Sequence, residues 1–459
     1  MKPFIYTSED YGAPQLQNQW GDLAKLLKTV LVTGFGDIES CTANRIANDT
    51  LEITLGIEAD IQIEGIIFLK GVTGHENTRL HVKSRPGPQK IIVKNYEGID
   101  LSAFAVGNVI CTVTRKPLGY TALYDDIENS GKIVFTNRNG WNLRVHDEFP
   151  KENTIWQSTW SKAARISYGR GMVNIDTWKG QPKNLNPGRP DSWKSPHYVG
   201  SASNSNVKIS ENAWYYAVPR DGLSTYVYSS LASNNTQKYH WTIIGTDTTF
   251  YLYINVGQNQ YYTCAQHCYG FGEFDSLISN DINNAFIISW NALGSTYVFS
   301  DAYNFKWQSV SITNTTIDEY AYKQLNIAAP ASQLTPNYIP CASLTWLKYS
   351  NLGNSHSGYS NSFNQASNDI GTLMYSPAYL EEYLYQLRGT MKGAKIILND
   401  VRTLIRSTVY SGQFLTVNAY NINGETDDKR YILKPHIYYH SEPNNNIVTV
   451  MFNTYEDWD

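Results

Sequence analysis

The clearest hydrophobic pattern in the chain is an apolar stripe between residues 20 and 33. Leucine and valine recur there at helical spacing, so the pattern predicts a short amphipathic helix with one buried face. The positions of this stripe are Leu23, Leu26, Leu27, Val30 and Leu31. Gly34 and Gly36 follow at once, where a left-handed residue would end the helix. Residues 1–10 before it predict a short extended segment that pairs with the edge of a sheet.

From residue 41 to residue 118 the pattern changes to short runs in which apolar and polar residues alternate. Runs such as "TLEITL", "QKIIVK" and "NVICTVT" are separated by Gly, Asn and Pro. Alternation with a period of two is typical of half-buried strands, and "RPGPQ" at 85–89 reads as a turn between two of them. The sequence therefore predicts a small β-barrel or sandwich domain over 41–118, preceded by an arm and helix over 1–40.

The same β pattern continues on a larger scale from residue 119 to residue 459. Its candidate strands are rich in Tyr, Trp, Ile, Val and Thr, which fit a pleated surface. Two polar stretches, 180–207 and 350–371, carry turn residues throughout and predict long surface loops. A short helix is predicted at 376–389. The fold class expected is mainly β, with several domains of sandwich or barrel type, one short N-terminal amphipathic helix and long polar loops.

Composition narrows the classes of partner. The 459 residues carry a formal net charge of −4, and only 17% of them are charged. No basic excess points to nucleic acid. The 34 tyrosines and 12 tryptophans suit extended sheets and large polar contact surfaces. No apolar stretch approaches the roughly 18 residues of a membrane span, so no membrane insertion is expected.

The cysteines indicate a reducing compartment during synthesis. There are five of them, an odd and scattered set, whereas a disulfide-stapled secreted domain would be denser in cysteine. The start, "MKPFIYTSEDYG", holds one lysine and no apolar run, so no secretory signal is expected. Both features favour reduced thiols and assembly in a cytosol.

One cysteine cluster is a candidate metal site. Cys264, His267 and Cys268 lie together in "TCAQHCYG". Zinc normally takes four ligands in a structural site, and no second Cys/His pair answers this one. Thiols packed under a loop are the favoured interpretation, and we expect neither a metal nor a cofactor.

Two carboxylates are the candidate catalytic groups. Glu273 and Asp275 stand two residues apart in "GEFD", so a strand would place them on one face about 7 Å apart. That separation suits a glycosidase. The alternative is that they are solvent-facing charges at a strand end, which we favour. The motifs of serine hydrolases, zinc proteases, P-loop proteins and EF-hands are absent from the sequence.

Several segments, in collinear order, resemble a family of bacteriophage virion structural proteins. The first is "YGAPQLQNQWGDLAKLLKTVLVTGFGD" at 11–37, where a Gly-Ala-Pro turn leads through a helix to a Gly-Phe-Gly stop. The matching residues there are Gly12, Ala13, Pro14, Leu16, Leu26, Leu27, Leu31, Val32, Gly34, Phe35 and Gly36. Further similar segments are 117–137, 142–148, 164–178, 241–254, 269–288 and 387–398.

This resemblance implies a non-enzymatic component of a phage particle, most simply an outer tail or sheath-like protein present in many copies around the tail. Its expected partners are other copies of itself and neighbouring tail or portal proteins. It would be synthesised in the cytoplasm of the bacterial host and reside in the virion tail. No catalytic residues carry over from the family.

Two other functions stay open. The first is a tail protein that binds a receptor or a bacterial surface glycan through the loops at 180–207 and 350–371. The second is a glycan-cleaving enzyme that uses Glu273 and Asp275. The stripe of the helix over 20–33 also has two interpretations, because its apolar face can dock onto a neighbouring subunit or close one end of the chain's own sandwich.

Overall fold

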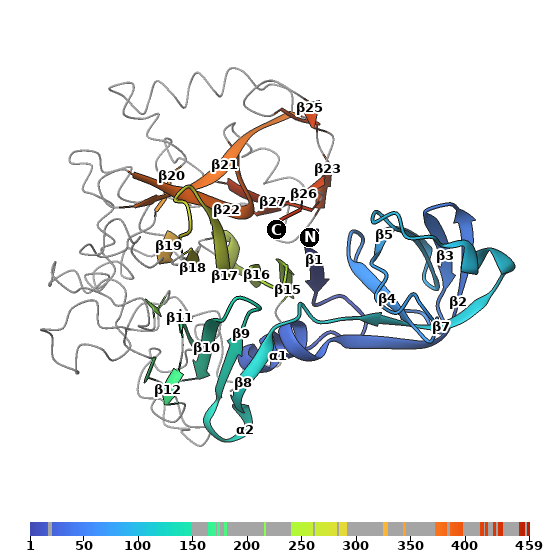
Figure 1. Ribbon diagram of the computed structural model, residues 1–459, viewed down its shortest axis with the longest axis horizontal. Coiled ribbons are helices and arrows are strands. Elements are labelled where there is room, and N and C mark those ends of the chain that lie inside the picture. Colours follow the sequence, from blue (N-terminus) through green and yellow to red (C-terminus); the bar gives the residue numbers. More distant parts are fainter. Residues whose placement is uncertain are drawn as a thin grey trace, which may run out of the picture.

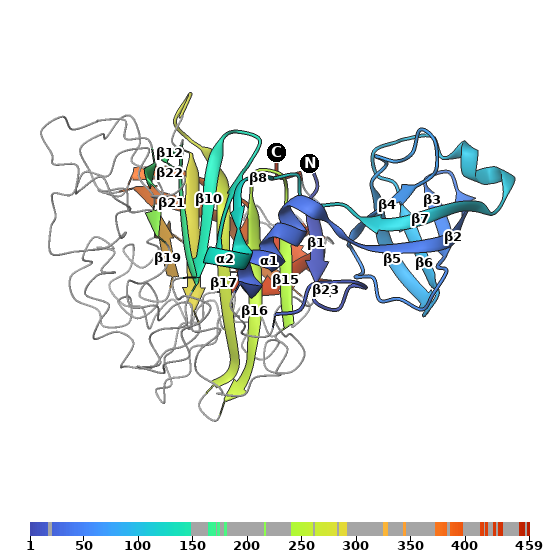
Figure 2. The same ribbon diagram turned by 90° about the horizontal axis from the view of Figure 1, so that it is seen from below.

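The described structure is mainly β (Figures 1 and 2), and it is a computed structural model. It describes residues 1–16, 21–147, 240–259, 262–281, 284–291, 386–397, 449–454 and 457–459. It also describes short strand segments at 164–170, 172–174, 179–180, 215–216, 325–328, 343–345, 372–382, 414–416, 418–420, 426–427 and 430–434. None of the helices in this part of the chain combines the length and the apolar character that crossing a membrane requires.

A closed six-stranded barrel stands at one end of the molecule (Figure 2). Its strands are β2 (Phe35–Ala47), β3 (Thr50–Thr54), β4 (Ile66–Lys70), β5 (Leu80–Gly87), β6 (Lys90–Lys94) and β7 (Val109–Arg115), in the order β2-β3-β6-β5-β4-β7. The apolar side chains of the alternating pattern fill the barrel. Leu51 and Ile53 of β3 and Ile91 and Val93 of β6 are all buried in its core. A 3-10 helix, η2 (Ser102–Val106), precedes β7.

The barrel is joined to the rest of the molecule through two adjacent strands. Chain enters it at Phe35 and leaves it at Arg115, and these two residues are opposite each other in the β2–β7 register. The barrel strands thus occupy residues 35–115, where the sequence predicted a domain over 41–118. The division of the rest into a single sandwich over 119–459 stays a prediction.

The N-terminal helix, α1 (Asp22–Lys28), continues as a π-helical turn, η1 (Thr29–Thr33). It ends at Gly34, whose φ of 76° lies in the left-handed region. A Cβ at Gly34 would lie 2.5 Å from the carbonyl oxygen of Arg115, so a side chain is excluded there by the neighbouring strand as well as by the backbone. The stop therefore belongs to the connection between helix and barrel.

The described strands of the body form two main sheets. The larger has 14 described strands, with a path that begins β1-β15-β16-β17-β22-β21. These are β1 (Phe4–Thr7), β15 (His240–Gly245), β16 (Phe250–Asn259), β17 (Tyr262–Ser276), β22 (Gln386–Ile397) and β21 (Thr372–Glu382). The path ends with β24 (Asn418–Tyr420) and β25 (Thr426–Asp427), and the strands off it are β18 (Ala285–Asn291), β19 (Leu325–Ala328), β20 (Ser343–Thr345), β23 (Phe414–Thr416), β26 (Arg430–Lys434) and β27 (Thr449–Asn453).

The second sheet has five described strands in the order β14-β11-β10-β9-β8. They are β8 (Thr121–Asp126), β9 (Lys132–Thr136), β10 (Trp141–Asp147), β11 (Ala164–Arg170) and β14 (Tyr215–Tyr216), with a four-residue helix, α2 (Ile127–Ser130), between the first two. A separate hairpin pairs β12 (Met172–Asn174) with β13 (Lys179–Gly180). Both main sheets and α1 contribute side chains to one hydrophobic core.

The helix predicted at 376–389 is wrong. Residues 376–382 lie in β21 and residues 386–389 lie in β22, two antiparallel strands whose register runs from Tyr375 opposite Ile397 to Glu382 opposite Gln386. Leucine and tyrosine there carried a helix-like spacing, but pairing across the hairpin and with β17 and β27 decides the structure. The N-terminal strand β1 pairs antiparallel with β15, and the two ends of the chain lie side by side (Figure 1).

Candidate functional site

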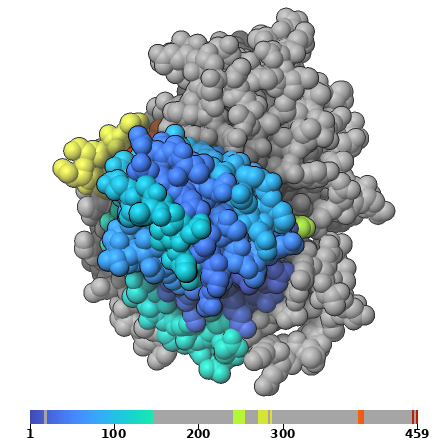
Figure 3. All heavy atoms as spheres, turned by 90° about the vertical axis from the view of Figure 1, so that its right-hand side faces the viewer, coloured from blue at the N-terminus to red at the C-terminus, as the bar shows by residue number. Residues whose placement is uncertain are grey.

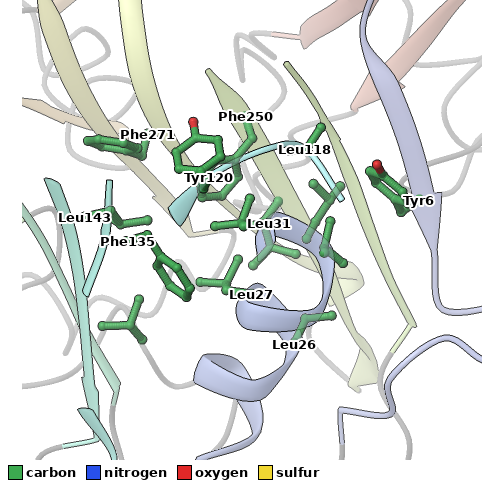
Figure 4. Close-up of a cluster of buried hydrophobic side chains, with 14 of the residues drawn as sticks. Tyr6, Leu26, Leu27, Leu31, Leu118, Tyr120, Phe135, Leu143, Phe250 and Phe271 are labelled. Carbon is green, nitrogen blue, oxygen red and sulfur yellow. The ribbon is translucent and has the colours of Figure 1, made fainter. Parts of the chain in front are cut away.

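The five residues predicted to form a docking face are buried inside this chain. Leu23 is 2% exposed, and the other four, Leu26, Leu27, Val30 and Leu31, are 0% exposed. Figure 4 shows α1 between the strands that carry Phe135 and Leu143 and the strand that carries Phe250. The apolar face of the helix therefore fills the chain's own core. This corrects the docking interpretation, because the surface that a neighbouring subunit would need is already covered.

Aromatic rings close the core above the helix. Tyr120, Phe250 and Phe271 form a triangle with ring centroids 5.9–6.4 Å apart. Burial raises the pKa of Tyr120 well above its usual value, and the charges of Glu273, Asp247 and Asp459 raise it further. The phenol is therefore locked in its neutral form, as a packing group.

Glu273 is a buried structural residue. It is 4% exposed. One carboxylate oxygen accepts a 2.8 Å hydrogen bond from the side-chain amide of Asn137, and the other accepts one of 2.8 Å from Asn139. The backbone amide of Glu273 donates to the Thr249 hydroxyl, which donates in turn to the carbonyl of Glu273. The carboxylate thus fastens the turn between β9 and β10 to β17.

Asp275, the other candidate catalytic carboxylate, is exposed at the end of β17. The two residues therefore do not present a matched pair to solvent, because Glu273 is committed to amide donors inside the fold. Asn137 tightens the same turn, since its side-chain oxygen accepts from the backbone amides of Asn139 and Trp141 at 3.1 and 2.9 Å. The arrangement suits a structural link between the two sheets better than proton transfer to a sugar.

An ion-pair network lies beside this turn. Arg138 bonds to Asp247 at 3.1 Å and to Asp459 at 3.2 Å, and Lys392 bonds to Asp459 at 2.7 Å. Burial alone would raise the pKa of Asp459, but the hydrogen bond and charge of Lys392, with Thr248 and Arg138, outweigh it and lower the pKa. Within the described residues, no cluster of His, Cys, Asp and Glu could hold a metal ion.

The other sequence-predicted positions are only partly covered. Cys264, His267 and Cys268 lie on β17, where His267 is opposite Ile254 and Cys268 is opposite Tyr253. Their side chains lie outside the described part of the structure, so the zinc interpretation is untested. The predicted loop at 350–371, and that at 180–207 beyond Gly180, also lie outside the described residues.

The junction between barrel and body is the most elaborate polar site that the structure describes. Arg115, at the end of β7, lies 3.4 Å from Asp10, and their side chains are 3% and 1% exposed. The guanidinium also donates to the carbonyl of Ile5 in β1 and lies 5.0 Å from the ring centroid of Tyr6. Tyr6 in turn donates to the carbonyl of Lys116 at 2.5 Å. One barrel residue therefore ties together three residues of the N-terminal arm.

Asp10 completes this site on the side of the arm. Its carboxylate accepts from the backbone amides of Thr7 at 2.9 Å and Gln62 at 2.7 Å. Burial raises the pKa of Asp10, while Arg115 and the two backbone amides oppose that rise. Because Gln62 belongs to the barrel and Thr7 to the arm, the carboxylate also bridges the two parts. The barrel is thus held in a defined orientation.

Away from the junction, the barrel carries exposed apolar side chains. Val106 is 88% exposed, Ile110 is 74% exposed and Ile46 is 56% exposed. Ile110 lies opposite Thr42 of β2, and the side chains of Asn44 and Asn108 are hydrogen-bonded two residues farther on. The register between β2 and β7 ends at Ala43 opposite Val109; Ile46 lies farther along β2, and Val106 lies in η2, which contacts β2. We call Ile46, Val106 and Ile110 the barrel patch; the barrel faces the viewer in Figure 3.

A cationic cluster surrounds Tyr96 on another part of the barrel. The ammonium groups of Lys2, Lys83 and Lys94 lie 4.4, 4.9 and 5.5 Å from its ring centroid. His81 packs edge-on against the same ring at 5.1 Å. Burial, followed by the charges of Lys2, Lys83 and Arg79, lowers the pKa of His81 to about 3. The histidine is therefore neutral and adds no charge to the cluster.

Comparison with protein-family models, with curated proteins and with solved structures finds no match for this chain. Its function has to be argued from its own residues. Sequence reasoning missed the junction and the asparagine turn. Arg115 and Asp10 are 105 positions apart, so no local pattern connects them. The only local signal for the turn was the "NRNG" run at 137–140.

Proposed function

We propose that this chain is a non-enzymatic structural component of a bacteriophage particle, an outer tail or sheath-like protein that assembles in several copies around the tail. The observation that carries the proposal is the barrel, which projects from the body (Figures 1 and 2), is held by a buried ion pair and exposes the barrel patch. The collinear resemblance to phage virion proteins supports the same function. Neighbouring tail or portal proteins are the other proposed partners.

The barrel patch is proposed to contact a second copy of this chain. Three side chains cover much less than the roughly 800 Å² that each partner buries in a standard stable interface. A contact of this size is weak for a single pair, and it becomes strong when many copies repeat it around a ring. A projecting module with a small apolar patch therefore fits a subunit of an array better than a stable dimer.

Two experiments test this proposal. Cryo-electron microscopy of purified particles should show density for the chain in stacked rings around the tail, and density only at fibre tips would refute the tail-layer role. With the isolated chain, concentration-dependent rings or tubes are expected in sedimentation and negative-stain images. Ile110→Asp should abolish them, whereas Leu277→Asp, at a body residue that is 61% exposed, should not. Equal effects of the two variants would remove the barrel patch from the proposal.

The alternative function, binding of a bacterial surface glycan, is favoured by the cationic cluster around Tyr96. Lys83 and Lys94 are paired with Glu64 and Asp49, each at 3.0 Å, so the carboxylates of an acidic polysaccharide would replace these partners while its sugars pack on the exposed ring of Tyr96. The wild-type chain would then bind an immobilised acidic polysaccharide, and Lys94→Met with Lys2→Met would weaken that binding at least several-fold. The alternative would be refuted if the double variant eluted from the immobilised polysaccharide at the same salt concentration as the wild-type chain.

A further inference from the structure

Two of the five cysteines meet inside the barrel. Cys41 in β2 lies directly opposite Cys111 in β7. They are 0% and 4% exposed, both contribute to the hydrophobic core of the barrel, and both are free thiols. Directly opposed residues of an antiparallel pair carry their side chains on the same face of the sheet. The two sulfur atoms are therefore neighbours in the barrel interior.

The backbone spacing at this position fits a disulfide. Opposed residues in antiparallel strands have Cα atoms about 4.5 or 5.5 Å apart, depending on the hydrogen-bonding pattern. Protein disulfides span Cα separations of about 4.4–6.8 Å. The strand is also irregular just before Cys41, because the register shifts between Ile38 and Cys41 and Ser40 has a φ of 55°. Small adjustments can be absorbed there, so the bond does not require the barrel to rearrange.

We propose that Cys41 and Cys111 form a reversible disulfide that joins the first and last strands of the barrel. The two thiols lose two protons and two electrons as the S–S bond forms. The electrons pass to a small disulfide such as oxidised glutathione, which is cleaved to two thiols through a mixed disulfide with one cysteine. The product closes a loop that contains β3, β4, β5 and β6. The barrel could then not open along the seam between β2 and β7.

The thiols are protected from rapid reaction. The thiol of Cys41 donates a 3.1 Å hydrogen bond to the carbonyl of Ile38. Burial raises the pKa of Cys111 to about 12, and the neighbouring Cys41 raises it further. Since the thiolate is the reacting form, oxidation at neutral pH depends on local opening of the seam. The bond is expected to form slowly in the folded chain and faster at alkaline pH.

The test uses the full chain with Cys264, Cys268 and Cys341 replaced by serine. The chain is incubated with oxidised glutathione and then treated with an alkylating reagent in denaturant. It should incorporate no alkyl group, because both thiols are already in the disulfide. Intact mass should fall by two hydrogens, and a non-reducing peptide map should show one linked pair containing Cys41 and Cys111. Dithiothreitol should reverse all three results. Adding Cys111→Ser to this variant is the matched control, and it should yield only a mixed disulfide with glutathione.

Two results would overturn the proposal. One is that both thiols can still be alkylated after the folded chain is incubated with oxidised glutathione at alkaline pH, while the unfolded chain forms the disulfide readily under the same conditions. The other is a peptide map of the oxidised wild-type chain in which Cys41 or Cys111 is linked to a different cysteine. The wild-type map also decides the question if the serine variant fails to fold. The proposal does not depend on the phage function, so its failure would leave that function open.

Discussion

Replacing Arg115 with methionine should loosen the attachment of the barrel to the body. Methionine keeps most of the aliphatic stem, but it removes the partner of Asp10 and the donor to the carbonyl of Ile5. Breaking a buried ion pair by removing one partner costs roughly 3–5 kcal/mol. The exposed pair between Lys70 and Asp37, with side chains 52% and 51% exposed, offers a control. Lys70→Met should cost less than about 1 kcal/mol.

The pH dependence of this loss identifies its cause. Burial already raises the pKa of Asp10, and Arg115 opposes the rise, so R115M should raise that pKa further. Below the unfolded pKa of about 3.9, Asp10 is protonated in both states and the extra cost is smallest. As the pH rises from there, the unfolded chain ionises and the buried carboxyl resists. Above the folded pKa of Asp10 in the wild type, which is itself raised, the wild-type carboxyl is ionised while that of R115M is not, so the stability of R115M should fall there relative to wild type by up to about 1.4 kcal/mol per pH unit.

Hydrogen exchange is the suitable assay, because it measures the opening of individual segments in a chain with several parts. Amides of residues 5–7 and 112–115 should exchange faster in R115M than in K70M at pH 7, and the difference should shrink near pH 4. Adding Asp10→Asn to R115M should recover part of the loss at pH 7. The reasoning would be refuted if R115M matched K70M, or if its effect were the same at both pH values.

Three further predictions concern single residues. Leu31→Ala should lower the free energy of unfolding by about 2–5 kcal/mol in urea titrations, whereas Ile110→Ala should change it by less than about 0.5 kcal/mol, and equal losses would contradict the burial difference. Glu273→Gln should lower the free energy of unfolding by about 1–3 kcal/mol and speed exchange of the amides at 137–141, because the amide group of the new glutamine would face an asparagine donor. Asp275→Asn, at the exposed residue two positions away, should change neither the stability nor the exchange. His81→Gln should reduce the loss of folding stability between pH 6.5 and 3. A histidine whose pKa is lowered on folding favours the folded state above its unfolded pKa, and it takes up a proton when acid unfolds the chain. Parallel plots of stability against pH for the two proteins would refute this.

Local patterns in the sequence predicted the β-rich fold and a small domain of barrel or sandwich type, but they did not decide between the two. Leu51 and Ile53 alternate with polar residues, and this alternation places them inside wherever the strand pairs. The helix predicted at 376–389 was wrong because strand pairing between β21 and β22 outweighed the helix-like spacing of the apolar residues. Local patterns could not reveal which surface covers a helix face, so Leu31 was equally compatible with a neighbouring subunit and with the chain's own core.

The candidate site was less predictable than the fold, because its contacts join distant segments. The bond between Asn137 and Glu273 spans 136 positions, and that between Arg115 and Asp10 spans 105. Glu273 read as a surface charge or a catalytic acid because acidic residues are rarely buried. Its burial becomes understandable only when both asparagine donors are in place. Long-range pairing of this kind leaves no periodic signal in a single sequence.

The adjacent entry and exit of the barrel make it an insertion in the body. The amide of Leu118 donates to the carbonyl of Val30 and that of Tyr120 to the carbonyl of Leu31, so the body chain is nearly continuous from η1 to β8 without the barrel. A short linker could replace residues 35–115 if the faces of Phe4 and Tyr6 that the barrel covers were made polar. Such a position allows a module to be gained, lost or exchanged while the body keeps its own core.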